Sequence, residues 1–168
     1  MDTFLAIASK RDQRVYSERE LSEDLVRRIL EAGRVSGSAS NRQPWTFLAV
    51  ESEELRGQVA ETVYAPDNVR GARLVVAIVV TGSPGFDCGR AAQNMMLAAW
   101  NEGVTSCPNG MPHPQKTSDV LGLSGEEHVL NILSFGYPAR RRDPESRPAD
   151  HWLKRAKRKP LNEVSRRL

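Results

Sequence analysis

An uninterrupted apolar run near the middle of the chain, residues 74–80, constrains the fold more than any other part of the sequence. Its seven residues, Leu-Val-Val-Ala-Ile-Val-Val, are rich in β-branched side chains and lack the alternation of a half-exposed strand. A run of this kind is typical of a strand that is covered on both faces. We therefore predict that residues 72–81 form the central strand of a sheet. The run is far too short to cross a bilayer.

Two segments around this strand have the apolar spacing of helices. Residues 21–32 carry an apolar stripe, and either Ser17, which opens a Ser-x-x-Glu capping box, or Ser22 can cap this helix. Residues 87–102 are apolar around much of the helix circumference. This is typical of a helix that packs against two surfaces at once, and a dimer interface would provide the second surface.

The other predicted elements are shorter. They are a helix at 3–9, a strand at 45–50, a helix at 53–63, a turn at 64–68, a loop at 107–112, a short helix at 118–121 and a strand at 128–135. The order of elements favours one layered α/β or α+β domain with a mixed sheet over residues 1–168. Beyond about residue 140 the composition shifts to Arg, Lys and Pro, which predicts an extended tail with only short packing segments.

The charges are unevenly distributed along the chain. Residues 140–168 hold 11 Lys or Arg against 4 Asp or Glu, whereas the preceding residues hold 13 against 17. Such a basic tail can bind nucleic acid or another anionic surface, fold back to supply cations to an anionic ligand, or remain solvated. Composition by itself favours the solvated tail.

The cysteines and histidines show no pattern of a metal site. Cys88 and Cys107 do not form a CxxC pair, and two cysteines are too few for a disulfide framework, so we predict buried free thiols. The three His residues are widely spaced and form no ligand pattern. Because the N-terminal residues lack a basic stretch followed by an apolar segment, we expect a cytoplasmic protein without a membrane span.

A basic cluster precedes the helix at 21–32. Lys10, Arg11 and Arg14 lie within five residues of one another. Three cations at this spacing can hold a phosphate. They can equally form the basic end of a helix, where cations meet the negative end of the helix dipole.

An amide-rich loop follows the same helix, before the strand at 45–50. It contains Ser38, Ser40, Asn41 and Gln43. Their hydroxyl and amide groups can address the polar edge of a flat heterocycle. They can also satisfy the backbone of the loop itself, which Ser and Asn do routinely. Together with the basic cluster, the loop indicates a phosphorylated ring cofactor.

Common nucleotide and hydrolase motifs are absent. The chain has no G-x-x-x-x-G-K-[ST] phosphate loop, and the turn at 82–85 after the apolar run does not have the form G-x-G-x-x-G. No G-x-S-x-G elbow occurs either. A P-loop nucleotidase, a Rossmann dehydrogenase and an α/β-hydrolase are therefore disfavoured.

Five short motifs occur in order along nearly the whole chain. They are Lys10-Arg11-x-x-Arg14-x-Tyr16, Ser38-x-x-Asn41-x-Gln43-Pro44-Trp45-x-Phe47, Asp87-x-Gly89-x-Ala91-x-Gln93-Asn94-Met95-Met96-Leu97-Ala98-Ala99, Gly136-Tyr137-Pro138 and Arg158-Lys159-Pro160-Leu161. In this order they resemble the nitroreductase family of flavoproteins. The resemblance implies an α+β fold with a mixed or antiparallel sheet flanked by helices. It also implies a homodimer with extended C-terminal tails and two FMN sites, each built from both subunits.

The resemblance further implies which residues bind FMN. The phosphate and ribityl region would be met by Lys10, Arg11, Arg14 and Arg158. The ring would be reached from the other subunit by Ser38, Asn41 and Gln43. Flavin N5 would be approached by the backbone amides of Asn109 and Gly110. No side chain is implied as a catalytic acid or base, because the cofactor carries the redox chemistry. Arg14 is the candidate that stabilises negative charge on the reduced ring. No metal is implied.

The implied function is an FMN-dependent oxidoreductase that passes hydride from NAD(P)H through the flavin to a nitroaromatic, quinone or similar acceptor. Three departures from the family pattern are visible, at Gly37, in the turn at 82–85 and at Asp12. Gly37 replaces a common proline, and only a short turn stands where many members have a helical excursion that covers the flavin. An open acceptor pocket is therefore expected.

Two other functions stay open. Asp12 stands where many members have serine, which is similar to the flavin-fragmenting dimethylbenzimidazole synthases. A non-catalytic module that binds flavin or nucleic acid is the other alternative. Nucleic acid is the less favoured ligand, because a basic tail that returns to the FMN phosphate needs no nucleic-acid partner. Most cations beyond Arg158, and those at 140–142, are left as solvated charges.

Overall fold

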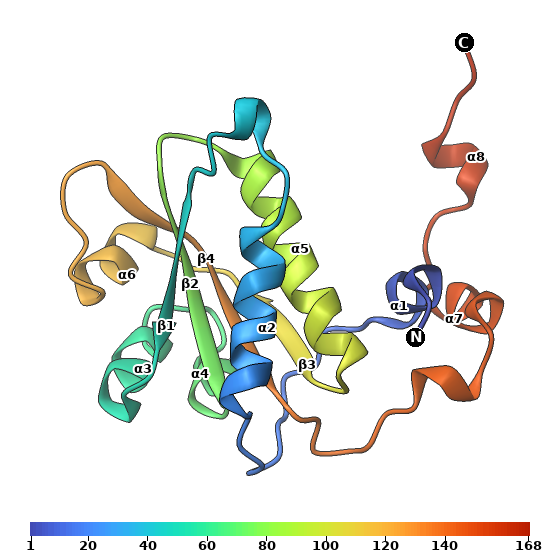
Figure 1. The fold of residues 1–168 in the computed structure, drawn as a ribbon, viewed down its shortest axis with the longest axis horizontal. Helices are drawn as coiled ribbons and strands as arrows, with labels where there is room; N and C mark the ends of the chain where they lie inside the picture. Colours follow the sequence, from blue (N-terminus) through green and yellow to red (C-terminus); the bar gives the residue numbers. More distant parts are fainter. The chain divides into compact units, whose positions relative to one another are not determined.

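The computed structural model describes residues 1–168, which divide into two compact units (Figure 1). The larger unit comprises Arg11–Arg141, and the smaller one combines Met1–Lys10 with Arg142–Leu168. The larger unit contains the whole sheet and the helices that cover it. The prediction of a single domain over residues 1–168 stays a prediction.

A four-stranded sheet with the order β1-β2-β4-β3 forms the centre of the larger unit. Its strands are β1 (Trp45–Val50), β2 (Leu74–Thr81), β3 (Thr105–Asn109) and β4 (Glu127–Gly136). β2 lies between β1 and β4, and residues 74–80 are all buried, which confirms the predicted central strand.

All neighbouring strands are antiparallel, so the mixed sheet expected from the order of elements is wrong and the antiparallel alternative is correct. β2 and β3, which are joined by a long helix, do run in the same direction. However, β4 lies between them and runs in the opposite direction. No parallel pair can therefore form.

Two segments that were predicted as loop or turn are regular elements. Residues 107–109 belong to β3 despite Pro108, because β3 is an edge strand and needs ladder hydrogen bonds on one side only. Residues 66–70 form the short helix α4 (Pro66–Arg70). Pro66 opens this helix, where the missing N–H of proline costs no intrahelical hydrogen bond.

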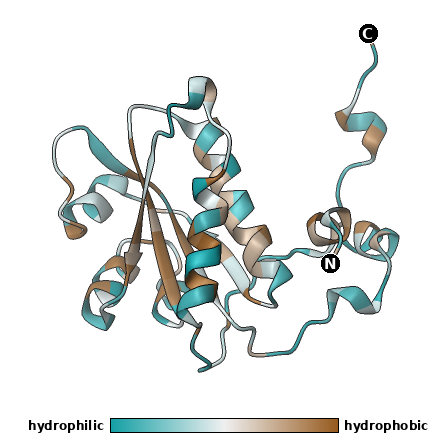
Figure 2. Ribbon diagram, in the orientation of Figure 1, coloured by the Kyte–Doolittle hydropathy of each residue, from teal (hydrophilic) through white to brown (hydrophobic).

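Helices cover both faces of the sheet (Figure 1). One face packs against α2 (Glu23–Arg34) and α5 (Gly85–Asn101), and the other against α3 (Glu53–Ala60), α4 and α6 (Pro114–Val120). Figure 2 shows the apolar residues concentrated along the central strands and on the helix sides that face them. The Ser22 Oγ accepts a hydrogen bond from the backbone N–H of Leu25 at 3.4 Å, so Ser22 is the cap of α2.

Gly33 marks the closest approach between α2 and its neighbours. A Cβ atom on this residue would lie 2.8 Å from the Sδ of Met95 on α5 and 2.9 Å from the Cε2 of Phe47 on β1. Both distances are shorter than van der Waals contact. Only a residue without a side chain therefore allows the observed packing of these three elements.

Changing Gly33 to Ala is expected to lower the free energy of unfolding by about 1–2 kcal/mol, because overpacking outweighs the gain in helix propensity. Gly57 is a matched control, since it also lies in a helix, α3, but a Cβ there would meet nothing within 4 Å. Gly57→Ala should raise stability by about 0.5–1 kcal/mol. Urea unfolding followed by far-UV circular dichroism measures both effects. Equal stabilities of Gly33→Ala and the unmodified protein would contradict the tight packing.

The N-terminal helix of the smaller unit agrees with its prediction. α1 (Thr3–Ser9) is capped by Asp2, whose Oδ1 accepts hydrogen bonds from the backbone N–H groups of Phe4 at 2.8 Å and Leu5 at 3.1 Å. α1 packs against α7 (Ala149–Arg155) of the basic tail.

The composition of the basic tail predicted an extended chain with only short packing segments. The tail in fact contains two short helices. Its apolar segments form α7 and α8 (Leu161–Val164), and the indole Nε1 of Trp152 donates a hydrogen bond to the carbonyl oxygen of Pro144 at 2.9 Å. The side chain of Trp152 is partly buried, whereas the charged residues beside it are exposed. None of the helices in the chain combines the length and apolar character needed to cross a bilayer.

Candidate functional site

The basic segment 11–17 is held along the edge of the sheet. Its backbone hydrogen bonds run from Gln13 N to Ser106 O (3.3 Å), from Ser17 N to Tyr137 O (2.8 Å) and from Ala139 N to Val15 O (3.2 Å). A β-bridge between Tyr16 and Pro138 continues this pairing. Arg14 is thereby fixed next to β3 and next to the chain that leaves β4, and Arg11 lies two residues before the first of these bonds.

The predicted phosphate ligands are divided between the two units. Arg11 and Arg14 belong to the larger unit, whereas Lys10 and Arg158 belong to the smaller one. Lys10 is the C-cap residue of α1, as the helix-end interpretation expected, and Arg158 is exposed. The assembly of all four cations into one clamp stays a prediction.

Arg14 is exposed and lies beside Cys107 on β3. A side-chain hydrogen bond and electrostatic attraction to Cys107 raise the pKa of Arg14 above its ordinary value, and Asp12 adds to the effect. The guanidinium is thus a permanent cation at this edge of the sheet. Cys107 and Cys88 are buried and free, as predicted.

Tyr16 connects the basic segment to the inside of the sheet. Its Oη lies 2.8 Å from the Oγ of Ser134 on β4, and burial raises the pKa of the Tyr16 phenol well above its ordinary value. A Cβ on Gly136 would lie 2.8 Å from the Tyr16 ring, so the strand needs glycine there. The motif that contains Gly136 therefore makes room for the tyrosine of the first motif, a role that sequence reasoning missed.

The side chain of Asn109, at the end of β3, is directed into the protein, and the residue is 3% exposed. Its Nδ2 lies within hydrogen-bond distance of Cys107 O (3.0 Å), Ile132 O (3.2 Å) and Ser134 Oγ (3.0 Å), and its Oδ1 accepts from Asn68 Nδ2 (3.1 Å). The two N–H groups of the amide already serve three acceptors. Asn109 can therefore offer a ligand only its backbone, which is the role that the resemblance implied.

Gly110 follows this buried amide and lies against Tyr64. The Gly110 carbonyl oxygen accepts a hydrogen bond from the backbone N–H of Tyr64 at 3.0 Å, and a Cβ on Gly110 would lie 3.2 Å from the Tyr64 ring. The side chain of Tyr64 is largely exposed. An accessible backbone beside an aromatic ring suits a flat ligand. Neither Tyr64 nor Asn68 was predicted as a site residue, because residues 64–68 have the composition of a turn.

The amide-rich loop partly satisfies its own polar groups. Ser38 Oγ accepts a hydrogen bond from Gln43 N at 2.9 Å, and Gln43 Nε2 donates to Asn41 O at 3.3 Å. The amide of Asn41 is exposed. Ser40, Asn41 and Gln43 all have a positive φ, of 50°, 53° and 50°. Residues other than glycine seldom adopt this conformation, and such strain is concentrated at functional sites.

The structure does not bring this loop to the basic segment of the same subunit. The two lie at opposite ends of α2 (Figure 1). A helix of 12 residues is about 18 Å long. The loop is therefore placed to act at a different site from the one beside Arg14, as the resemblance expects of a loop that serves the other subunit.

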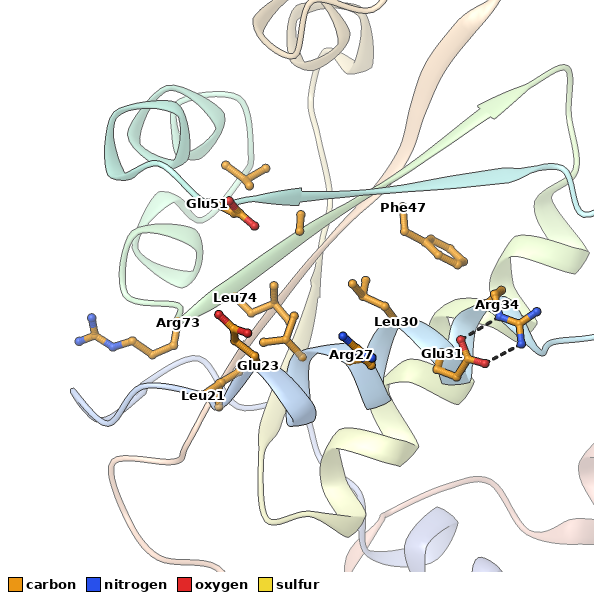
Figure 3. Close-up of a pocket in the computed structure, with 13 residues that line it drawn as sticks. Leu21, Glu23, Arg27, Leu30, Glu31, Arg34, Phe47, Glu51, Arg73 and Leu74 are labelled. Atoms are coloured by element: carbon orange, nitrogen blue, oxygen red, sulfur yellow. Dashed lines mark hydrogen bonds and ion pairs between the residues drawn. The ribbon is translucent and has the colours of Figure 1, made fainter.

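An open groove of about 660 Å³ lies between α2 and β1. Figure 3 shows the side chains of Leu30 and Phe47 facing each other across it, with the ion pair of Arg34 and Glu31 at its rim. The groove contains none of the predicted cofactor residues. No group of three or more His, Cys, Asp or Glu side chains in the chain is arranged to hold a metal ion. The chemistry available near Arg14 is thus that of cations, backbone amides and aromatic surface.

Comparison with known proteins identifies the family. The model of the Nitroreductase family matches residues 7–78 and 84–137. A relative from Methanothermobacter thermautotrophicus, named "Putative NADH dehydrogenase/NAD(P)H nitroreductase", is 32% identical over 150 residues, which cover 83% of this chain and 78% of the relative. A protein of the same name from Archaeoglobus fulgidus is 30% identical over 151 residues, covering 82% and 86%. The chain belongs to the nitroreductase family.

Solved structures agree with this assignment. A nitroreductase family protein from Clostridium difficile has the same fold, with a TM-score of 0.84, 19% identity and coverage of 99% of this chain and 98% of that one. A "putative nitroreductase in complex with FMN" from Desulfovibrio desulfuricans has a TM-score of 0.81 at 25% identity and covers 98% and 96%. The predicted family and α+β fold are confirmed, and the chain is an oxidoreductase enzyme.

Proposed function

We propose that the chain is an FMN-dependent oxidoreductase that passes hydride from NAD(P)H through the flavin to a nitroaromatic, quinone or similar acceptor. The observation that carries the proposal is the position of Arg14 beside β3, the strand that ends at Asn109 and leads into Gly110. A cation and backbone amides suit an anionic phosphate and the polar edge of a flavin ring. The FMN complex of the Desulfovibrio relative supports the cofactor, and the names of the archaeal relatives support NAD(P)H.

The residues at this edge fit FMN. Arg11 and Arg14 would supply positive charge for a dianionic phosphate. Lys10 and Arg158 stay predicted ligands of the same phosphate. Gly110 has no side chain to keep a ring away from the backbone. The buried amide of Asn109 fixes that backbone in place, because its hydrogen bonds reach both β3 and β4.

Each protein group has a defined task in the proposed reaction. When bound, FMN supplies the two-electron redox chemistry at its N5 atom, so the protein needs no acid or base of its own there. The backbone of Asn109 and Gly110 would orient the ring. Arg14 would hold positive charge where negative charge develops. Because only residues 82–84 separate β2 from α5, no helical excursion from this segment covers the site, and we infer a shallow pocket with broad acceptor specificity.

A homodimer with shared FMN sites is part of the proposal. Ser38, Asn41 and Gln43 would come from a second copy of the chain, since they lie at the far end of α2 from Arg14. A cytoplasmic location is also part of the proposal. No nucleic-acid partner is needed, because Arg158 of the basic tail would use its charge on the FMN phosphate.

The purified protein is expected to be yellow, with a flavin absorption band at about 450 nm and roughly one FMN per chain after release. NADH and NADPH, tested separately, should bleach this band, and menadione or nitrofurazone should restore it. A colourless protein that takes up no FMN on reconstitution, and that binds DNA with a steep salt dependence, would overturn the proposal. Conversion of FMN to dimethylbenzimidazole after reduction in the presence of oxygen would favour the alternative suggested by Asp12.

A further inference from the structure

One face of α5 holds the amide-rich loop, residues 36–43. Asp87, Arg90 and Asn94 follow one another at spacings of three and four residues, so their side chains lie on the same side of the helix. Each of the three contacts a different residue of the segment 36–39. The loop therefore lies along a row of polar side chains.

Hydrogen bonds form the two ends of this row. The Oδ2 of Asp87 accepts a hydrogen bond from the backbone N–H of Ala39 at 3.0 Å. The Nδ2 of Asn94 donates to Ser36 Oγ at 2.7 Å, and that hydroxyl donates in turn to the carbonyl oxygen of Ala32 on α2 at 3.1 Å. The first residues of the loop are thus joined to α5 on one side and to the end of α2 on the other.

Arg90 occupies the middle of the row. A Cβ on Gly37 would lie 2.5 Å from the Nη2 of Arg90, so the guanidinium fills the space that a side chain at position 37 would need. The Nη1 of Arg90 lies 3.9 Å from the Oδ1 of Asp87. This contact gives a physical reason for glycine at position 37.

We propose that Asp87, Arg90 and Asn94 are positioning residues that hold the amide-rich loop in its flavin-binding conformation. Three residues of the loop have a positive φ, and such a conformation persists only where the surroundings enforce it. The row on α5 fixes residues 36, 37 and 39, which lead directly into this strained part of the loop. The inference rests on the proposed function for the identity of the ligand, but the fastening of the loop can be tested without FMN.

Loop fastening is measured in the apoprotein as the rate at which trypsin cleaves after Arg42, which is exposed in the loop. FMN affinity is measured separately by flavin fluorescence, and the urea midpoint of each variant verifies that it is folded. Asp87→Ala should accelerate the cleavage and weaken FMN binding about tenfold, since a hydrogen bond to a charged group is lost. Asp87→Asn keeps an oxygen acceptor and should restore most of both. Arg28→Ala is the control. The Nη1 of Arg28 on α2 donates a hydrogen bond to the Oε1 of Glu102, the C-cap residue of α5, at 2.6 Å, and this contact does not involve the loop.

A double-mutant cycle tests the contact between Gly37 and Arg90. Gly37→Ala and Arg90→Ala should each accelerate cleavage after Arg42 and weaken FMN binding, and the double variant should be no worse than either single one, because both remove the same contact. Gly37→Ala is expected to stay folded, since only the flexible end of Arg90 must move. Unchanged cleavage, or additive effects in the cycle, would overturn the inference. Faster cleavage with unchanged FMN affinity would overturn the flavin role of the loop instead, and with it that part of the proposed function.

Discussion

Changing Arg14 to Ala should weaken FMN binding about 10- to 100-fold, because a hydrogen bond between two charged groups contributes about 1.5–3 kcal/mol and each 1.4 kcal/mol is a factor of ten. Since Cys107 raises the pKa of Arg14, its charge is lost only at strongly alkaline pH. The contribution of Arg14 to FMN affinity should therefore be constant between about pH 7.5 and 9, where the FMN phosphate is dianionic. Flavin fluorescence titrations at several pH values measure both effects.

Two further variants separate the charge of Arg14 from its shape. Arg14→Lys retains a cation but loses the planar fork, and we expect an intermediate affinity. Arg19→Ala is the matched control, because Arg19 lies in the same part of the chain but stacks on Tyr137, with its Cζ 3.9 Å from the ring centroid. Equal FMN affinities of the Arg14→Ala and Arg19→Ala proteins would show that Arg14 is not a cofactor ligand.

Changing Asn109 to Ala is expected to lower the free energy of unfolding by about 3 kcal/mol. The substitution removes the donor for two backbone carbonyls and for Ser134, and the acceptor for Asn68, all inside the protein. Buried polar groups without a partner cost about 1–3 kcal/mol each, and networks amplify the loss. Urea unfolding of the apoprotein measures the effect, and reconstitution should also show weaker FMN binding because the backbone of Gly110 loses its support.

Asn109→Asp and Asn101→Ala complete the Asn109 series. The aspartate has the shape of the native residue but cannot donate to the carbonyls and brings a buried charge, so it should also be strongly destabilising. Asn101 is exposed at the end of α5, and its removal should change stability by less than about 0.5 kcal/mol. Comparable stabilities of the Asn109→Ala and Asn101→Ala proteins would contradict the buried network.

Much of the fold could be predicted because its signals are local. The apolar run at 74–80 predicted β2, and the stripe at 21–32 predicted α2, since each period reflects which side of the element is buried. β3 was missed because Pro108 and Gly110 resemble a loop in isolation. Only the position of β3 at the sheet edge makes a proline acceptable there. The antiparallel direction of all neighbouring strands also could not be predicted from local signals, because it depends on the insertion of β4 between β2 and β3.

The candidate site was predictable in composition and not in arrangement. Short motifs identified Arg14 and Asn41 as residue types suited to a flavin, and the resemblance added Gly110 by its position after the long helix, but neither gave a role to Tyr16 or Asn68. Those two residues support the site through hydrogen bonds to strands that lie far away in the sequence. A pattern confined to neighbouring residues carries no information on such contacts.

The sequence by itself therefore determined the family, the central strand and the chemical groups offered to a cofactor, because these depend on local periodicity and on the order of motifs. The tertiary structure alone decided that Asn109 turns its amide inward, that Arg14 lies beside Cys107, and that Gly37 gives its space to Arg90. It also separated the amide-rich loop from Arg14 by the length of α2. The physical reason is that each of these features depends on which distant segments share a hydrogen bond or a volume, and that is settled only when the sheet and its helices pack together.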